Sequence, residues 1–241
     1  MAAIVIYIIC NSTFTLVAAQ RPKILCLHGG GGNQNSIAAA VTDIANALPE
    51  YEFVYVNGAY GQNSYLWIRD PPGGKDQPTT DPGWADESIQ VLDDILEAQG
   101  PFHGILGYSQ GAAFVPVYLS RVPNDTFRVA ITFCGYLPTT HLGLIDIVQE
   151  RSPFGNISHL VWMGGNDFII SNSMTREMAA EFTSPSIINS NAAGHVVPAS
   201  NDPTFEQVVS WIRSSSPTTP TPTKNFFCLL VYITIIGVIL L

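Results

Sequence analysis

Residues 102–119 read FHGILGYSQGAAFVPVYL, and this stretch decides the fold. Its first residues have the apolar composition of a buried strand, and its last residues have that of a buried helix. The pentapeptide GYSQG at 107–111 lies between them, so the chain must turn sharply at Ser109. A side chain in place of Gly107 or Gly111 would collide with a neighbouring element at so tight a turn. The pattern predicts a strained, exposed serine hydroxyl of the kind that acts as a nucleophile.

Such a serine needs a base to remove its proton, and His195 is the candidate that we favour. It lies in AGHVVP at 193–198, after a short apolar stretch, where the glycine lets the loop bend back over the sheet. His141 and His159 also follow Ser109, but they occupy a loop and the entry to a strand. We therefore expect His195 to be the general base.

The acid that orients this base is expected at Asp167. A buried strand, HLVWM at 159–163, runs straight into GGND at 164–167, which places the aspartate at the carboxyl end of a parallel strand. The same four residues also have the composition of an ordinary turn. Asp146 and Asp202 compete less well, because one precedes this strand and the other follows the histidine.

The negative oxygen of a tetrahedral intermediate needs backbone N–H donors. One donor should be the N–H of Gln110, the residue after the serine. The second is expected from the glycine run HGGGG at 28–32, with Gly30 first and Gly31 next. His28 is expected to be structural, with its ring bonded to nearby backbone. No Gly-Lys-Ser/Thr follows the glycines, which argues against a phosphate-binding loop.

The order of elements predicts an α/β fold. We expect strands near residues 23–27, 53–56, 102–106, 128–134, 159–163 and 186–189, and helices near 34–47, 86–99, 110–120, 173–183 and 204–213. Strands that alternate with helices give a mainly parallel sheet with helices on both faces. With the serine turn, this predicts a minimal α/β-hydrolase of about six strands.

The long irregular stretch 58–82 is expected beside the serine turn. It is more apolar around Trp67 than a surface loop requires. We interpret it as a wall or lid of the substrate site, with a loop packed on its own aromatic side chains as the alternative. Trp67 and Tyr108 are accordingly predicted to contact substrate.

These motifs also carry a family resemblance. The relevant blocks are LCLHG at 25–29, residues 84–96, GPFHGILGYSQGAA at 100–113, residues 129–136, the strand that ends at Asp167, and GHVVP at 194–198. Together they resemble the fungal-type serine hydrolase (FSH) family over roughly residues 22–213. The resemblance implies Ser109, Asp167 and His195 as a catalytic triad and activity on carboxylic esters or thioesters.

The two ends of the sequence are hydrophobic and predict export. Residues 1–19 have the pattern of a signal peptide cleaved after Ala19, with an uncleaved anchor as the alternative. The hydrolase domain then covers 20–213, and a Ser/Thr/Pro-rich stalk covers 214–225. The uncharged tail 226–241 fits a GPI-attachment signal or a transmembrane anchor. We expect a secreted or cell-surface protein that is tethered at its C-terminal end.

The net charge and the composition of the sequence limit the classes of binding partner that we expect. The formal net charge is −9, which argues against nucleic acid or an anionic membrane face as a partner. Asn124 and Asn156 begin glycosylation sequons. Cys26 and Cys134 lie in predicted core strands, and the sequence shows no metal-ligand cluster. We expect a monomeric enzyme without a cofactor, and the alternative is a catalytically idle surface module that keeps the hydrolase fold.

Overall fold

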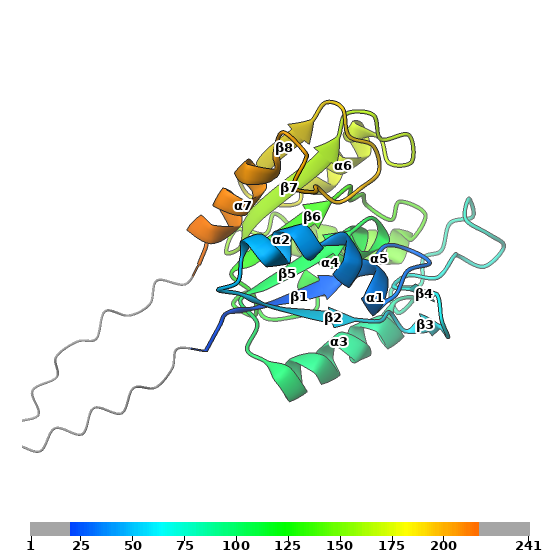
Figure 1. The fold of residues 1–241 in the computed structure, drawn as a ribbon. Helices are drawn as coiled ribbons and strands as arrows, with labels where there is room; N and C mark the ends of the chain where they lie inside the picture. Colours follow the sequence, from blue (N-terminus) through cyan, green and yellow to red (C-terminus); the bar gives the residue numbers. More distant parts are fainter. Residues whose placement is uncertain (1–19, 217–241) are drawn as a thin grey trace, which may run out of the picture.

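The computed structural model describes residues 20–216, which form a three-layer α/β fold (Figure 1). A six-stranded sheet lies in the middle, in the order β2-β1-β5-β6-β7-β8, and every neighbouring pair is parallel. Its strands are β1 (Lys23–Leu27), β2 (Glu52–Val56), β5 (Gly104–Tyr108), β6 (Val129–Phe133), β7 (Ser158–Gly164) and β8 (Ser186–Ser190). All six therefore end at the same edge of the sheet, where an α/β protein builds its sites.

Helices cover both faces of this sheet. One face carries α1 (Gln34–Ala40), α2 (Thr42–Ala47) and α7 (Phe205–Ser214), and the other carries α3 (Asp86–Gln99), α4 (Gln110–Leu119) and α5 (Leu142–Arg151). A seventh helix, α6 (Asn172–Ala179), packs beside β7.

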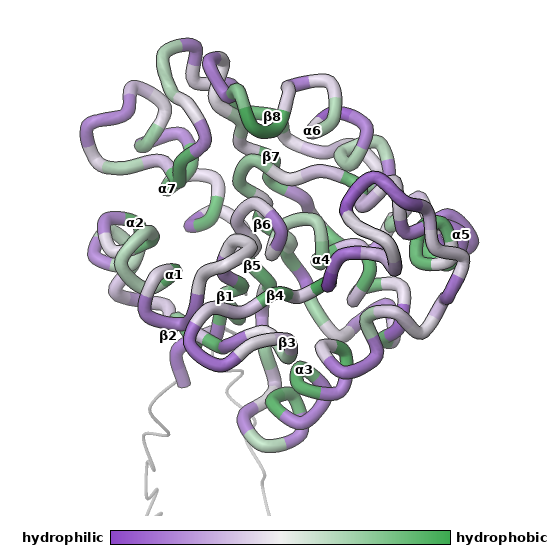
Figure 2. The backbone as a smooth tube through the Cα atoms, turned by 90° about the vertical axis from the view of Figure 1, so that its right-hand side faces the viewer, coloured by the Kyte–Doolittle hydropathy of each residue, from purple (hydrophilic) through white to green (hydrophobic). Residues whose placement is uncertain are grey.

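Two hydrophobic cores follow from the alternation of side chains along each strand. In β1, Ile24 and Cys26 face the core under α1, α2 and α7, whereas Leu25 and Leu27 face the core under α3, α4 and α5. All four side chains are fully buried. Figure 2 looks onto the carboxyl ends of the strands. The residues of the strands are mainly hydrophobic, and those of the surrounding loops are mainly hydrophilic.

The structure confirms the predicted minimal α/β-hydrolase sheet and corrects three details. The expected helix 34–47 is two helices, because the backbone breaks at Val41. Helix α5 was missed, although Leu144 and Val148 are buried at the i, i+4 spacing that marks a helix face. The stretch 58–82 contains a short antiparallel hairpin of β3 (Tyr60–Gly61) and β4 (Tyr65–Leu66).

The two ends of the described chain lie at the opposite edge of the sheet from the strand ends (Figure 1). Pro22 accepts a hydrogen bond from the N–H of Glu52, and the hydroxyl groups of Tyr51 and Ser216 are 2.6 Å apart. His103 contacts both ends, because its backbone N–H bonds Lys23 and its ring bonds the carbonyl of Ser215. The leading and trailing ends of the fold are therefore fixed beside each other.

The predicted signal peptide, the stalk beyond residue 216 and the apolar tail lie outside the described residues. Within residues 20–216, none of the helices combines the length and the apolar character needed to cross a membrane.

Candidate active site

Ser109 lies at the junction of β5 and α4, where the sequence predicted a sharp turn. Its backbone has φ 54° and ψ −118°, a left-handed conformation that costs energy for any residue with a Cβ. A Cβ on Gly107 would lie 2.5 Å from the carbonyl oxygen of Gly111, and a Cβ on Gly111 would lie 2.5 Å from those of Leu27 and His28. The two glycines are thus required by backbone contacts, and they let the turn present the serine.

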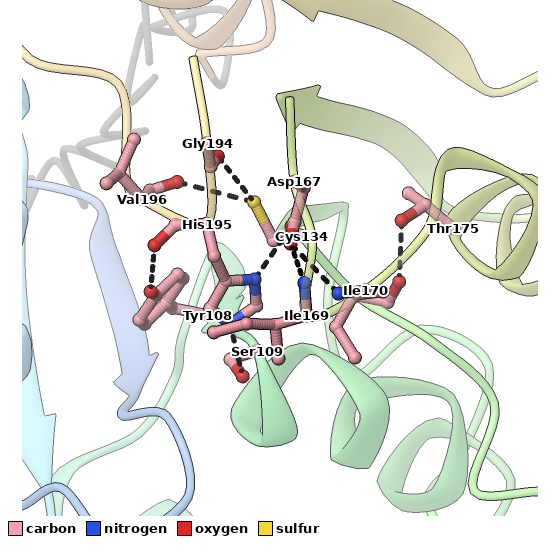
Figure 3. Close-up of polar contacts among 11 residues, drawn as sticks. Tyr108, Ser109, Cys134, Asp167, Ile169, Ile170, Thr175, Gly194, His195 and Val196 are labelled. Atoms are coloured by element: carbon pink, nitrogen blue, oxygen red, sulfur yellow. Dashed lines mark hydrogen bonds and ion pairs between the residues drawn. The ribbon is translucent and has the colours of Figure 1, made fainter. Parts of the chain in front are cut away.

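His195 and Asp167 form a hydrogen-bonded chain with this serine (Figure 3). Nε2 of His195 is 2.9 Å from Oγ of Ser109, and Nδ1 of the same ring is 2.7 Å from Oδ2 of Asp167. Because a carboxylate only accepts, Nδ1 carries the proton, and Nε2 is left with a lone pair directed at the serine hydroxyl. The structure therefore brings together the three side chains that the sequence placed far apart.

The Asp167 carboxylate is held firmly in this position. Its side chain is 1% exposed, and its Oδ1 accepts hydrogen bonds of 2.9 Å from the N–H groups of Ile169 and Ile170. Burial by itself would raise the pKa of this carboxyl. The hydrogen bonds from Ile170, His195 and Ile169 favour the charged form more strongly and lower the pKa below its ordinary value. Asp167 is therefore ionised at neutral pH.

The glycine run after β1 packs against the serine turn. The N–H of Gly58 donates to Nε2 of His28, so the proton of this buried ring is on Nδ1, which donates to the carbonyl of Gly29 at 2.7 Å. His28 is thus structural, as predicted. Fixing the carbonyl of Gly29 also fixes the N–H of Gly30 on the other side of the same planar peptide.

Two backbone donors remain free at this point. Within residues 20–216, neither the N–H of Gly30 nor that of Gln110 has a hydrogen-bond acceptor. A Cβ built on Gly30 would lie 3.4 Å from that of Gln110, so the two residues lie next to each other. Two unpaired N–H groups next to a candidate nucleophile can stabilise a negative oxygen.

The side chain of Gln110 has a role that the sequence did not reveal. Its Oε1 accepts from the N–H of Trp67 at 2.9 Å, and its Nε2 donates to the carbonyl of Ile68 at 2.9 Å. The amide therefore ties the end of β4 to the serine turn. Only the position of Gln110, next to the nucleophile, could have drawn attention to it.

Trp67 does not face an open site, which corrects our expectation of a substrate contact. Its side chain is fully buried, its Nε1 donates to the carbonyl of His28, and its ring stacks on Phe114 with centroids 5.5 Å apart. The apolar character of this loop segment thus comes partly from anchoring the loop in the core.

Tyr108 is half-buried between the glycine run and His195. Its hydroxyl donates to the carbonyl of His195 at 2.8 Å, and the two rings lie 5.2 Å apart. Its side chain also lines a hollow of about 270 Å³ with residues 29–32. Tyr108 thus supports the histidine, and its predicted contact with substrate stays a prediction.

Cys134 is a site residue that the sequence analysis missed. It follows β6 with φ 51°, its side chain is buried, and its thiol donates to the carbonyl of Val196 at 3.4 Å. Burial, and then the charge of Asp167, raise the pKa of the thiol to about 12, so it stays a neutral donor. Its place at the carboxyl end of the strand beside β5 was the available signal.

Cys134, Asp167 and His195 also offer ligand atoms that lie within 4.8 Å of one another. The sequence had shown no such grouping. The ring and the carboxylate already share a 2.7 Å hydrogen bond, which occupies the atoms that a metal ion would need.

A hollow of about 220 Å³ begins at Gln110, beside the nucleophile. Its lining includes Ile68, Asp70 and Lys75 from the stretch 58–82, residues 136–141 and Met174. Part of the stretch 58–82 therefore forms a wall of a cavity next to the serine, and its role as a wall of the substrate site stays a prediction.

The competing residues lie elsewhere in the fold. Asp146 is exposed on α5, and Asp202 accepts hydrogen bonds from Ser190 and Thr204. His141 contacts the carbonyl of Arg69, and His159 is buried beside Thr132. None of these four candidates joins the hydrogen-bonded chain at Ser109.

The parallel sheet, the serine turn and the order of the three side chains define an α/β-hydrolase. The family model described as "Serine hydrolase (FSH1)" matches residues 61–206, more than half of the chain. The chain therefore belongs to the FSH1 serine hydrolase family.

Curated relatives are named esterases, and a solved structure shares the fold. The chain is 26% identical over 204 residues to "Esterase FPY3" of Fusarium mangiferae, which covers 73% of this chain and 88% of the relative. It is 33% identical over 121 residues to "Esterase alnB" of Emericella nidulans, or 46% of this chain and 42% of the relative. The maize (Zea mays) acyl-protein thioesterase 2 has the same fold, with a TM-score of 0.60 at 17% identity, over 83% of this chain and 95% of that structure.

Proposed function

We propose that this protein hydrolyses carboxylic esters, and thioesters by the same chemistry, through an acyl-enzyme on Ser109. The single observation that carries this proposal is the hydrogen-bonded chain from Ser109 through His195 to Asp167. Such a chain activates a serine hydroxyl that would otherwise be a weak nucleophile. Relatives named esterases support the same reaction class.

In the proposed first half-reaction, Oγ of Ser109 attacks the ester carbonyl carbon while Nε2 of His195 takes the hydroxyl proton. The carbonyl oxygen becomes negative and accepts hydrogen bonds from the N–H groups of Gly30 and Gln110. Asp167 stabilises the imidazolium. The bond to the alcohol oxygen then breaks, and His195 passes its proton to that oxygen.

In the second half-reaction, His195 removes a proton from water, which attacks the acyl-enzyme. The same two N–H groups hold the negative oxygen, and the proton returns from His195 to Oγ of Ser109 as the acid leaves. Activity should fall in acid, because a protonated His195 cannot accept the serine proton.

A fluorophosphonate probe tests the proposal directly. We expect one probe per folded chain, attached to Ser109, and loss of both labelling and ester turnover in Ser109→Ala by several powers of ten. Ser210→Ala changes an exposed serine on α7 and serves as the matched control. A folded wild-type protein that neither reacts with the probe nor hydrolyses esters would instead be an idle binding module.

We also propose that the domain acts outside the cytosol on a C-terminal tether. The support is the sequence pattern of the two ends, together with the exposure of Asn124 and Asn156, which border one hollow. Expression in a cell with a secretory pathway should give a product whose apparent mass falls when peptide N-glycosidase removes its glycans. Asn124→Gln and Asn156→Gln together should abolish this fall in mass. Release by a phosphatidylinositol-specific phospholipase supports a GPI tail, and resistance to release supports a transmembrane tail.

A further inference from the structure

Two large apolar side chains are exposed directly after the acid of the site. Phe168 is 96% exposed and Ile169 is 69% exposed. Within residues 20–216 they are the two most exposed of the large apolar side chains. Adjacent apolar side chains that face solvent at a site are typical of contact with a ligand. We call Phe168 and Ile169 the apolar rim.

The backbone of the apolar rim is held by the site itself. The N–H of Ile169 and that of the next residue, Ile170, both donate to Oδ1 of Asp167. In Figure 3 the Ile169 side chain is turned toward the His195 ring and Ser109. Ile169 is therefore placed by the same carboxylate that orients the histidine, on the histidine side of the serine, and Phe168 lies between it and Asp167 in the sequence.

The chemistry of ester cleavage decides which part of a substrate lies on the histidine side of Ser109. His195 must give its proton to the alcohol oxygen, so that oxygen lies within hydrogen-bond reach of Nε2. The carbonyl oxygen points instead toward the N–H groups of Gly30 and Gln110. The alcohol part of the ester thus leaves the reaction centre past His195, where Ile169 lies.

We infer a limit on the acyl part from the hollow that Gln110, the residue next to the serine, helps to line. Its volume of about 220 Å³ is below the roughly 300–1,000 Å³ of pockets that enclose a drug-sized ligand. Charged Asp70 and Lys75 also contribute to its wall, which does not suit a long hydrocarbon chain.

We propose that Phe168 and Ile169 bind the apolar alcohol part of the substrate, so that the enzyme prefers short-chain acyl esters of larger apolar alcohols. This inference rests on the proposed esterase function and specifies its substrate class. It makes the apolar rim a specificity determinant that acts before the alcohol leaves.

The test compares kcat/KM for ethyl, butyl and hexyl acetate in solution. These primary alcohols have similar acidity, so intrinsic reactivity is nearly constant along the series and all of them form the same acetyl-enzyme. Partial burial of a methylene against the apolar rim should raise kcat/KM about twofold, which gives on the order of a tenfold rise from ethyl to hexyl acetate.

Ile169→Thr, alone and with Phe168→Ser, should flatten this rise from ethyl to hexyl acetate. Ile187→Thr is the matched control, because Ile187 is a 39% exposed isoleucine on β8, and it should keep the full rise. A second series, from ethyl acetate to ethyl hexanoate, varies only the acyl part. The apolar-rim variants should leave the dependence on acyl length unchanged.

Equal losses on ethyl and hexyl acetate, or a change in the acyl series instead of the alcohol series, would overturn the proposal. An effect that appears only above the solubility limit of the ester would identify the apolar rim as a docking surface for lipid aggregates and would also refute it. Failure of the esterase function itself looks different, because the wild-type protein would then show neither ester turnover nor fluorophosphonate labelling.

Discussion

Replacing Gln110 by methionine separates the two roles that the structure gives this residue. Methionine has a similar length and keeps the backbone N–H, but it removes both side-chain hydrogen bonds, to the N–H of Trp67 and the carbonyl of Ile68. Trp67 is 0% and Ile68 is 2% exposed, so these backbone groups have little access to water as a substitute partner.

The expected cost follows from that burial. Each lost hydrogen bond contributes about 1 kcal/mol net, and a buried group left unsatisfied adds to this, so Gln110→Met should lower the free energy of unfolding by about 3 kcal/mol. For a domain of this size, the melting temperature should fall by about 6–12 °C. Urea denaturation followed by circular dichroism measures the first quantity, and a thermal scan measures the second.

Gln90→Met is the control, because the Gln90 side chain bonds only the exposed Asp94 on α3. It should change the free energy of unfolding by less than about 0.5 kcal/mol. Below its melting temperature, Gln110→Met should still react with a fluorophosphonate, since the backbone N–H is retained. A loss of stability below about 1 kcal/mol would refute the view that this amide anchors the loop to the serine turn.

Three further predictions concern single residues. Gly111→Ala should fail to give a stable fold, because its Cβ would lie 2.5 Å from backbone oxygens. Gly30→Ala, whose Cβ would have its nearest contact at 3.4 Å, should melt within a few degrees of the wild type. Equal melting temperatures of the two variants would contradict this. Burial raises the pKa of the Cys134 thiol to about 12, so iodoacetamide at pH 8 should alkylate this thiol only after the protein unfolds. Mass spectrometry measures the alkylation, and labelling of Cys134 in the folded protein would contradict its burial. Burial lowers the pKa of His159 to about 3, so protonation of this ring favours the unfolded chain from about pH 6.5 downward. As the pH falls, the wild type should lose stability relative to His159→Phe by up to about 1.4 kcal/mol per pH unit. Equal changes in the free energy of unfolding of both proteins between pH 6.5 and 4, measured by denaturation, would exclude this role.

The sequence predicted the sheet well because buried parallel strands are short apolar runs between turn residues. β1 was predicted at its observed bounds, and the other five strands of the parallel sheet were placed within about two residues of theirs. It also predicted which histidine and aspartate meet Ser109, because the order of these side chains and their places at strand ends are imposed by the topology. These features depend on local composition and on chain order.

Features that depend on contacts across the fold were not predictable in the same way. The burial of Trp67 arises from packing on Phe114, and the hydrogen bonds of Gln110 join residues far apart in the sequence. The same holds for Cys134, whose thiol reaches the carbonyl of Val196. Side chains of this kind have no periodic signal, since their partners are set only when the helices dock on the sheet.

The position of the two chain ends has a practical consequence. Gln20 and Ser216 leave the fold at the edge of the sheet where the strands begin, and the reaction site lies at the edge where they end. A fusion partner or a solid support attached at either end should therefore leave access to Ser109 unobstructed. Because both ends lie around Tyr51 and His103, the domain also suits circular permutation, with a linker across the ends and a new opening in the exposed loop at residues 72–77.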